Sequence, residues 1–251
     1  MIENHNLLHT YQKNDCYNHY ENTMTAFKKA LEAGADMIET DVRMTKDGVL
    51  VLIHDDSVDR TTDGTGKVKD FTYNQLQELN AGTVTNPEKI PSFDDFMKWA
   101  SESKMMVNIE FKEYHQEGNE ERCVECIKKI IDCVEKYDMA EQVVINSFDA
   151  WVLEYVHNNY EKKYMIHGFY PYDIMINVNQ NPDEYLDCAC IFSAKNKEYY
   201  DYLEKKDIEV WIGAGVTQEN LLELSISYGA KLITTNNPAD VLKKLKGLGK
   251  R

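Results

Sequence analysis

Short apolar stretches alternate along the chain with longer segments in which apolar residues recur every three or four positions. The first pattern is typical of buried strands and the second of amphipathic helices. We expect strands over residues 6–11, 35–42, 105–111, 142–148, 163–170, 188–192, 208–215 and 230–235. We expect helices over residues 23–34, 93–103, 119–137, 149–160, 196–206, 217–229 and 238–248, with a less regular helical stretch over 172–185.

Eight strands, each followed by a helical segment, predict an α/β protein with a parallel, closed sheet, the TIM (β/α)8 barrel. The chain has 251 residues, which is close to the usual size of one such barrel. A doubly wound open sheet is the alternative, but no glycine-rich dinucleotide fingerprint follows the first strand. Residues 1–251 are therefore predicted to form one domain.

Two further segments depart from a simple repeat. Residues 49–54 form another apolar run that extends the sheet region after the second barrel strand. The turn-rich segment of about residues 56–91 is too long for an ordinary barrel loop. We interpret it as a short insertion over the catalytic face, not as a separate domain.

Charged side chains gather at the predicted strand ends. Glu39 and Asp41 alternate on one face of the second strand, His54 ends the run after it, and Glu110 and Lys112 end the third strand. In a TIM barrel these ends meet at the catalytic face. Three carboxylates suit Mg²⁺ or Ca²⁺ better than zinc, so we predict that Glu39, Asp41 and Glu110 bind such a metal. Solvated acids on an edge strand and a surface Glu110–Lys112 ion pair are the structural alternatives.

Charge and hydropathy narrow the classes of partner. The formal net charge is −15, with 43 acidic and 28 basic residues, which opposes binding to nucleic acid or to anionic membranes. An anionic substrate would need a local site, built by a metal and a few lysines. Because neither a basic and apolar leader nor a spanning apolar run is found, we expect a cytoplasmic protein.

The six cysteines fit structural thiols. Cys123, Cys126 and Cys133 fall on one face of a predicted helix, and Cys188 and Cys190 alternate in a predicted strand. No His/Cys set has the spacing of a structural zinc site, so we expect reduced, buried thiols.

In order and spacing, several segments resemble the glycerophosphodiester phosphodiesterase family. They are ENT from Glu21, AFKKALEAGADMIETDVRMTKDG, VLVLIHDDSVDRTTDGTGKV, KIPSF and NIEFK. The resemblance is dense from Glu21 to about Lys112 and thinner beyond. It implies a TIM barrel, a bound divalent metal, two acid/base histidines and the cleavage of glycerol phosphodiesters. In that family the substrate's own glycerol hydroxyl is generally thought to attack through a cyclic phosphate.

The resemblance assigns the acid/base roles to His9 and His54. Histidine titrates near neutral pH, so one imidazole can accept a proton while the other donates one. Lys112 shares a strand face with Glu110 and is placed to meet a phosphate oxygen. His167 follows near the end of the fifth strand and could line the same pocket. The expected partner is a small phosphodiester, and the oligomeric state stays open, a homo-oligomer included.

The chain departs from the family at its first loop. His-Arg-Gly is usual there, whereas this chain has His9, Thr10 and Tyr11. The arginine that would grip the phosphate is absent, and Lys13 is a candidate substitute.

The seventh and eighth strands depart as well. The family pattern Trp-Thr-Val-Asn is here Trp211, Ile212, Gly213 and Ala214, of which Trp211 keeps the substrate-contacting position that the resemblance implies. The family's Thr-Asp-x-Pro becomes the segment 235–238, TNNP.

Three functional hypotheses follow. The first is a metal-dependent phosphodiesterase that hydrolyses glycerophosphodiesters to an alcohol and glycerol 3-phosphate. The second is a weak or inactive relative that binds a phosphoester. The third is a lysophospholipid phosphodiesterase, which would need an apolar mouth, and residues 166–176 are the candidate for it.

Overall fold

The computed structural model describes the backbone of residues 7–10 and the full residues 21–160 and 162–251. Its strands are β1 (Leu7–Thr10), β2 (Met37–Met44), β3 (Leu50–Leu52), β4 (Met106–Phe111), β5 (Val143–Asn146), β6 (Met165–Phe169), β7 (Cys188–Ile191), β8 (Glu209–Ile212) and β9 (Leu232–Thr235). Its α-helices are α1 (Met24–Glu32), α2 (Tyr73–Leu76), α3 (Phe93–Ser103), α4 (Glu120–Lys136), α5 (Ala150–Asn159), α6 (Lys197–Lys205), α7 (Glu219–Ser227) and α8 (Pro238–Gly247).

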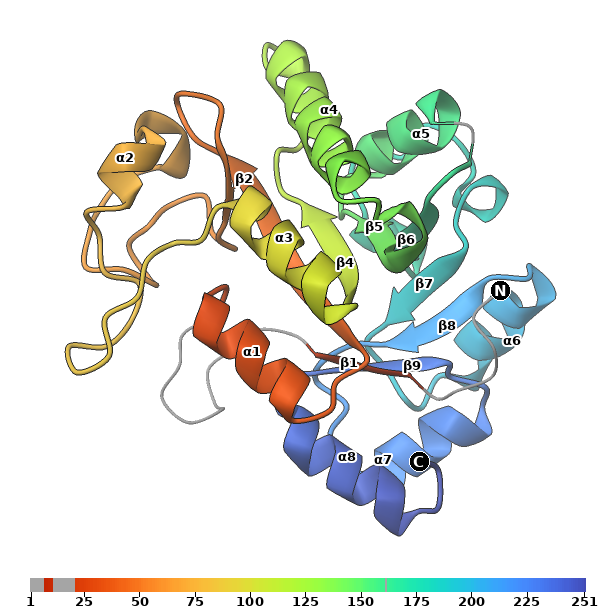
Figure 1. The fold of residues 1–251 in the computed structure, drawn as a ribbon. Helices are drawn as coiled ribbons and strands as arrows, with labels where there is room; N and C mark the ends of the chain where they lie inside the picture. The colour runs from red at the N-terminus through yellow and green to blue at the C-terminus, as the bar shows by residue number, and fades with distance from the viewer. Residues whose placement is uncertain (1–6, 11–20, 161) are drawn as a thin grey trace.

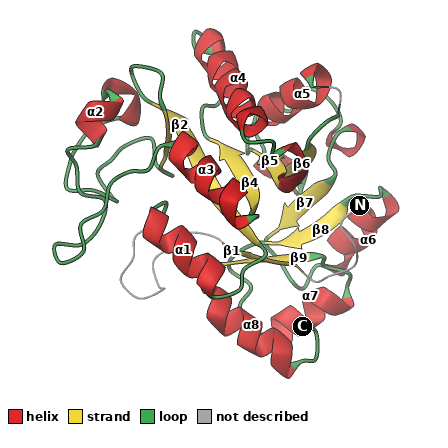
Figure 2. Ribbon diagram, in the orientation of Figure 1, coloured by secondary structure: helices red, strands yellow, loops and turns green. Residues whose placement is uncertain are grey.

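The sheet is a closed TIM barrel, as the alternating pattern predicted. Neighbouring strands follow the order β1-β9-β8-β7-β6-β5-β4-β2, and β1 also pairs with β2, which closes the ring. All of these pairings are parallel. The helices lie outside the strands (Figures 1 and 2). Burying both faces of the sheet requires this arrangement, because the parallel strands are apolar on their outer side as well.

The predicted extension after the second strand is the short strand β3. It runs antiparallel to the end of β2, with Val42 opposite Leu52 and Met44 opposite Leu50. It therefore lies beside the barrel ring and brings the chain back past the carboxyl end of β2.

Between β3 and α3, residues 53–92 form an excursion that projects beside the β2 and β3 end of the barrel (Figure 1). It contains the 3₁₀ turn η1 (Val68–Asp70) and helix α2. Its buried apolar residues join Val51 of β3 in a cluster separate from the main core, and they are Ile53, Val58, Val68, Leu76, Ala81 and Ile90. This small core explains how so long a connection keeps a defined conformation.

The β6 to β7 connection contains two 3₁₀ turns and no α-helix. They are η3 (Tyr172–Ile174) and η4 (Pro182–Glu184), so the less regular helical stretch predicted there is present only as single turns. None of the described helices is long and apolar enough to cross a bilayer.

The barrel interior is built in layers two residues apart along each strand. The layer nearest the amino ends is apolar and contains Met37, Val144, Cys188, Trp211 and Leu232. The next layer is mostly polar and contains Glu39, Asn108, Asn146, His167 and Thr234. The apolar layer therefore closes the amino end of the barrel, and the polar layer above it forms the floor of the open, carboxyl end.

The cysteine prediction is confirmed for the described residues. Cys123, Cys126 and Cys133 are buried on one side of α4, and Cys188 and Cys190 are buried in β7. All five are free thiols.

Candidate active site

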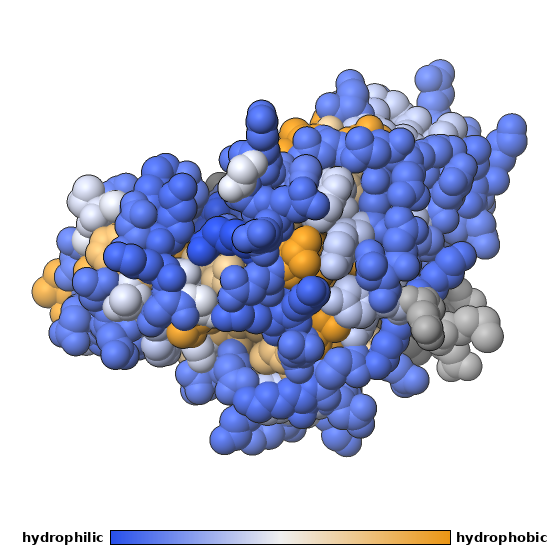
Figure 3. All heavy atoms as spheres, turned by 90° about the horizontal axis from the view of Figure 1, so that it is seen from above, coloured by the Kyte–Doolittle hydropathy of each residue, from blue (hydrophilic) through white to orange (hydrophobic). Residues whose placement is uncertain are grey.

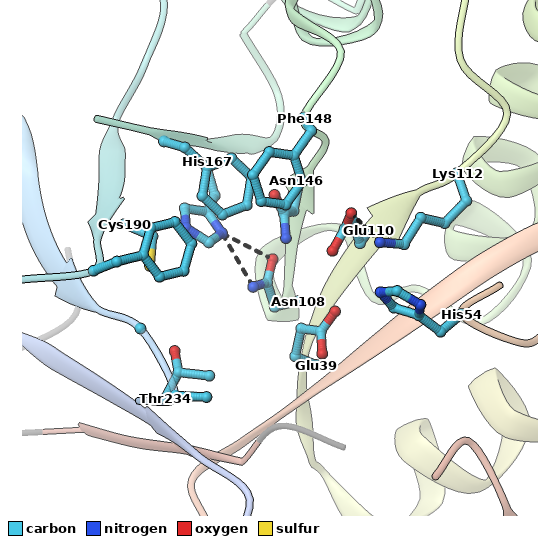
Figure 4. A pocket seen from close by; sticks show the side chains of 14 residues that line it. Glu39, His54, Asn108, Glu110, Lys112, Asn146, Phe148, His167, Cys190 and Thr234 are labelled. Atoms are coloured by element: carbon cyan, nitrogen blue, oxygen red, sulfur yellow. Dashed lines mark hydrogen bonds and ion pairs between the residues drawn. The ribbon is translucent and has the colours of Figure 1, made fainter. Parts of the chain in front are cut away.

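A cavity of about 250 Å³ opens at the carboxyl ends of the barrel strands. Its lining comes from every part of the ring that follows β1 in sequence: Glu39, His54, Asn108, Glu110, Lys112, Asn146, Phe148, His167, Phe169, Cys190, Phe192, Gly213, Ala214 and Thr234. Figure 4 shows Glu39, Glu110, Lys112 and His54 on one side, with His167 and Cys190 on the other. Glu39, Glu110 and Lys112 thus lie across the cavity from His167 and Cys190.

Three carboxylates lie together on the charged wall. Strand β2 contributes Glu39 and Asp41, and strand β4 contributes Glu110, whose Cα is paired with that of Asp41. One oxygen from each carboxylate lies within 4.8 Å of the other two, and all three residues are buried. Burying several like charges is costly unless a cation joins them. This donor set therefore fits a hard divalent metal ion, as the strand-end pattern predicted.

The pKa shifts of the carboxylates agree with a site that fits a metal ion. Burial raises the pKa of Glu39 well above its usual value, and the neighbouring Asp41 and Glu110 raise it further. Burial also raises the pKa of Glu110, although Lys112 acts in the opposite direction. The cluster therefore holds more negative charge than one lysine neutralises, so a cation would stabilise its ionised form.

Lys112 is the cation inside the cluster. Its ammonium nitrogen lies 3.1 Å from Asp41 Oδ1 and donates a hydrogen bond to Glu110 Oε1. Burial lowers the pKa of Lys112, but Asp41 and Glu110 outweigh it and the pKa rises, so the side chain is charged. Lys112 also lines the cavity, which places its charge within reach of an anion bound there.

Asn22 orients Asp41 from the loop before α1. Its side-chain amide donates to Asp41 Oδ2 at 3.1 Å, and its carbonyl oxygen accepts from the Thr40 hydroxyl at 2.9 Å. Asn22 has a positive φ of 56°, a conformation that asparagine tolerates better than most residues. No role was predicted for Asn22, because nothing local links it to Asp41, nineteen residues later.

His54 stands at the start of a chain of charged contacts. Its Nδ1 lies 2.7 Å from Asp55 Oδ1, and Arg60 Nε donates to Asp55 Oδ2 at 2.6 Å. Arg60 also donates to both oxygens of Glu21, one of them at 2.9 Å. The insertion therefore holds the His54 partner in place through Arg60, which fixes the imidazole at Nδ1 and leaves Nε2 for chemistry.

Arg43 binds the backbone near His54 and near Lys112. Its guanidinium donates to the backbone carbonyl of His54 at 2.8 Å and to that of Lys112 at 3.1 Å. It thereby ties the two loops that carry these residues to strand β2.

The Asp55 contact predicts a pH-dependent stability. The Arg60 hydrogen bond holds the pKa of Asp55 well below its usual range. A lowered folded-state pKa stabilises the protein above the unfolded-state value near 4, and that stability is lost as pH falls through the folded-state pKa. We expect Asp55→Asn to lower the free energy of urea unfolding at pH 7, with the difference from wild type shrinking steadily below about pH 4.

Asp56→Asn is the matched control, because the neighbouring Asp56 pairs with the exposed Lys67 outside this chain of contacts. An equal, pH-independent loss in both variants would contradict the role given to Asp55.

Amide and imidazole groups form the floor of the cavity. Asn108 and His167 interact through their side chains, with Asn108 Nδ2 3.1 Å from His167 Nδ1. Asn146 Oδ1 is buried and accepts no hydrogen bond from the described residues. His167, whose place in the pocket the sequence left open, lines the cavity. Asn108 and Asn146 were not predicted, although each is a polar residue at an inward position of an apolar strand, which was the available signal.

Comparison with known proteins identifies the family. The sequence profile of the glycerophosphoryl diester phosphodiesterase family matches residues 12–214. The chain belongs to this family. It is therefore a member of a family of phosphoric diester hydrolases, as the resemblance in the sequence implied.

Individual members of the family are similar over different lengths. A glycerophosphodiester phosphodiesterase of Caldanaerobacter subterraneus subsp. tengcongensis is 42% identical over 147 residues, which are 56% of this chain and only 58% of that protein. One of Bacillus altitudinis is 32% identical over 239 residues, which are 92% of this chain and 87% of that protein.

Solved structures from the family share the barrel. An Oleispira antarctica phosphodiesterase, in complex with the product sn-glycerol-3-phosphate, has a TM-score of 0.76 at 18% identity, with 96% of each chain covered. A glycerophosphodiester phosphodiesterase of Agrobacterium tumefaciens has a TM-score of 0.76 at 20% identity, with 94% of this chain and 99% of that chain covered. These similarities establish the fold.

The structure does not describe the side chains of two predicted site residues, His9 and Lys13. The backbone of His9 lies in β1, opposite Met37 and Thr234, but its side chain is outside the described residues. Lys13 is also outside the described residues.

Trp211 requires a correction. Its side chain is 1% exposed and lies in the apolar layer that closes the barrel, with its ring centroid 4.6 Å from that of His167. Because inward positions alternate, Gly213 reaches the cavity and Trp211 lies one layer below it. Trp211 therefore supports the floor through His167 and does not line the cavity.

Three phenylalanines line the cavity at the ends of β5, β6 and β7, and only Phe169 lies in the segment 166–176 that was the candidate for an apolar mouth. Phe148, Phe169 and Phe192 follow or end the consecutive strands β5, β6 and β7, and all three line the cavity. Phe148 and Phe169 stack with ring centroids 3.6 Å apart, and Phe169 and Phe192 are parallel at 5.9 Å. We call these three residues the ring wall.

Proposed function

We propose that this chain is a metal-dependent phosphodiesterase that hydrolyses glycerophosphodiesters to an alcohol and glycerol 3-phosphate. The observation that carries the proposal is a buried carboxylate triad, two of whose members line the cavity, together with a cavity-lining histidine held at Nδ1. The relatives named as glycerophosphodiester phosphodiesterases, and the solved relative that holds glycerol 3-phosphate, support the same substrate class.

Glu39, Asp41 and Glu110 would hold the metal, for which Mg²⁺ or Ca²⁺ suits an all-oxygen site. When bound, such an ion stabilises charge on the phosphoryl oxygens of a diester. Lys112, charged and adjacent to two of the three carboxylates, would bind a further phosphoryl oxygen. Lys13 is the proposed replacement for the arginine that the first loop of the family usually carries.

His54 would transfer the proton. Asp55 accepts a hydrogen bond from His54 Nδ1, which leaves Nε2 to exchange a proton with a substrate oxygen. Cleavage of a diester needs one group that takes a proton from the attacking hydroxyl and one that gives a proton to the leaving oxygen. We propose that His54 and His9, in strand β1, share these two roles, without assigning which histidine is the acid and which is the base.

The direct test is hydrolysis of glycerophosphocholine and glycerophosphoethanolamine with and without EDTA, followed by enzymatic assay of glycerol 3-phosphate. We expect EDTA to lower the rate by about a hundredfold or more, because a bound cation supplies several kcal/mol of charge stabilisation in the transition state. Adding Mg²⁺ or Ca²⁺ in excess should restore the rate.

EDTA already saturated with Mg²⁺ is the control for effects of the chelator itself. A rate that EDTA does not change would contradict metal dependence. No turnover of any diester, with divalent metal binding retained, would favour a phosphoester-binding relative.

A further inference from the structure

Asn146 is a polar side chain that water at the protein surface does not serve. Hydrophilic residues dominate the face in Figure 3, where solvent satisfies their hydrogen bonds. Asn146 is only 2% exposed and lies in the floor of the barrel cavity. A buried amide needs partners from the protein or from a ligand, because leaving its polar groups unpaired costs free energy.

The described residues supply no partner for the carbonyl oxygen of this amide. Asn146 Oδ1 is buried and accepts a hydrogen bond from none of them. The two other buried asparagines of the described chain differ in this respect. Asn22 Nδ2 donates to Asp41 Oδ2 at 3.1 Å, and Asn108 Nδ2 lies 3.1 Å from His167 Nδ1. Among these three asparagines, Asn146 is therefore the one whose polar group is left for a ligand.

The register of the barrel places Asn146 between the carboxylates and the rest of the floor. Its Cα is paired with that of Glu110 on β4 and with that of His167 on β6. Figure 4 shows the Asn146 side chain between the side chains of these two residues. Lys112, the cation of the charged cluster, lines the same cavity. A phosphoester held beside Lys112 would therefore extend its alcohol arm over Asn146.

The size and the chemistry of the floor define the arm that fits. The cavity of about 250 Å³ is smaller than the roughly 300–1,000 Å³ of sites for drug-sized ligands, so it accommodates a short arm. An apolar arm would leave the amide of Asn146 unpaired. A hydroxyl can donate to the carbonyl oxygen or accept from the amide nitrogen. A short arm that carries a hydroxyl is therefore the best match.

We propose that Asn146 is a specificity-determining residue that forms a hydrogen bond with a hydroxyl group on the short arm of the bound phosphoester. The cavity then selects polyol phosphates over analogues that lack this hydroxyl, because the deoxy ligand leaves a buried amide unpaired. The inference rests on the proposed function only in taking a phosphoester as the ligand. It adds a residue that recognises the alcohol, whereas Lys112 and the carboxylates act on the phosphate.

Calorimetric titration in Mg²⁺ measures the binding of three phosphomonoesters, which a diesterase does not cleave. They are sn-glycerol 3-phosphate, 2-hydroxypropyl phosphate of matching configuration, which lacks the terminal hydroxyl, and 3-hydroxypropyl phosphate, which lacks the central one. We expect one of the two analogues to bind the wild-type chain at least about tenfold more weakly than glycerol 3-phosphate. Equal dissociation constants for all three ligands would overturn the proposal.

Two variants assign that difference to the amide of Asn146. Asn146→Leu keeps a similar shape without polar atoms, and Asn146→Ser, which adds no bulk, decides the matter if the leucine variant does not fold. In both, the affinity ratio for the recognised hydroxyl should fall to within about twofold of unity. Ratios that both variants leave at the wild-type value would rule out Asn146 as the specificity residue. Asn158→Leu, at an exposed position of α5 outside the cavity lining, is the matched control and should keep the ratio.

Thermal unfolding in EDTA, without ligand, distinguishes recognition from a structural role. We expect the melting temperature of Asn146→Leu to equal or exceed that of wild type, because the substitution removes an unpaired buried polar group. An amide that the fold requires would instead give a lower melting temperature with both affinity ratios unchanged, which would contradict the inference. Where the ratio is lost, the inference stands whichever way the melting temperature moves.

Turnover of glycerophosphoethanolamine tests the proposed function separately. The affinity ratios need no catalysis, so they decide the role of Asn146 even if no diester is cleaved. Cleavage of the diester, combined with ratios that Asn146→Leu does not change, would keep the proposed function and overturn this inference.

Discussion

Replacing His54 with alanine should lower kcat for glycerophosphoethanolamine by about 10²–10⁴-fold. That is the range over which a positioned general acid or base contributes to catalysis. His54 is the described histidine that lines the cavity beside the carboxylates, and its hydrogen bond to Asp55 holds it there. The measurement is the steady-state rate of glycerol 3-phosphate release with Mg²⁺ present.

His157→Ala is the matched control, because His157 lies on α5 and is not part of the cavity lining. It should keep the wild-type rate. The Mg²⁺-induced rise in melting temperature should survive in His54→Ala, which would show that the loss is not one of metal binding. A His54→Ala enzyme within threefold of wild type would exclude His54 as a proton-transfer group.

Replacing Glu39 with glutamine should abolish turnover and at the same time stabilise the metal-free protein. Burial and the charges of Asp41 and Glu110 oppose the ionised form of Glu39, so a neutral side chain of the same shape relieves repulsion. We expect the melting temperature in EDTA to rise by about 2–6 °C. Removing one of three carboxylates should also eliminate most of the stabilisation by added Mg²⁺ or Ca²⁺, which for a saturating ligand is about 2–4 kcal/mol.

Differential scanning calorimetry in EDTA and in excess cation measures both effects. Glu102→Gln, which changes an exposed glutamate on α3, is the control and should alter neither. A Glu39→Gln protein that is less stable than wild type in EDTA, and still stabilised by the cation, would show that Glu39 is a structural residue and not a metal ligand. Improved stability with lost activity is the expected signature of a functional site that is strained when empty.

The carboxylate triad was predictable because each of its members obeys a local rule. Glu39 and Asp41 are two residues apart on a strand with apolar neighbours, and Glu110 ends the next barrel strand. Parallel strands in adjacent positions bring such ends together without any knowledge of side-chain packing. The barrel, the order of its strands and the carboxylate triad follow from that one periodicity and from the family motif.

The supporting residues were not predictable in the same way. Asn22 contacts Asp41, and Arg60 joins Asp55 to Glu21, across sequence separations of 19 and 39 residues. The path of the insertion places Arg60 and depends on the small apolar core there, whereas the Asn22 contact depends on how the loop before α1 packs against β2. Side chains in loops carry no periodic signal, so only the folded chain reveals their partners.

Trp211 was predicted to be a site residue but lies outside the cavity. The family motif assigned it to the substrate, and its position in β8 is one layer too low, so Gly213 takes the place at the cavity instead. The ring wall likewise depends on register, since Phe148, Phe169 and Phe192 come from three strands whose ends are level only in the closed barrel.

By itself the sequence determined the barrel, the acidic strand ends and His54, because hydrophobic alternation and strand-end polarity are local properties of the chain. The tertiary structure alone decided how His54 is held, which layer each inward residue occupies and that three phenylalanines line the same cavity as the carboxylates. Those features depend on register and on packing between distant segments, and neither is encoded in any single stretch of the chain.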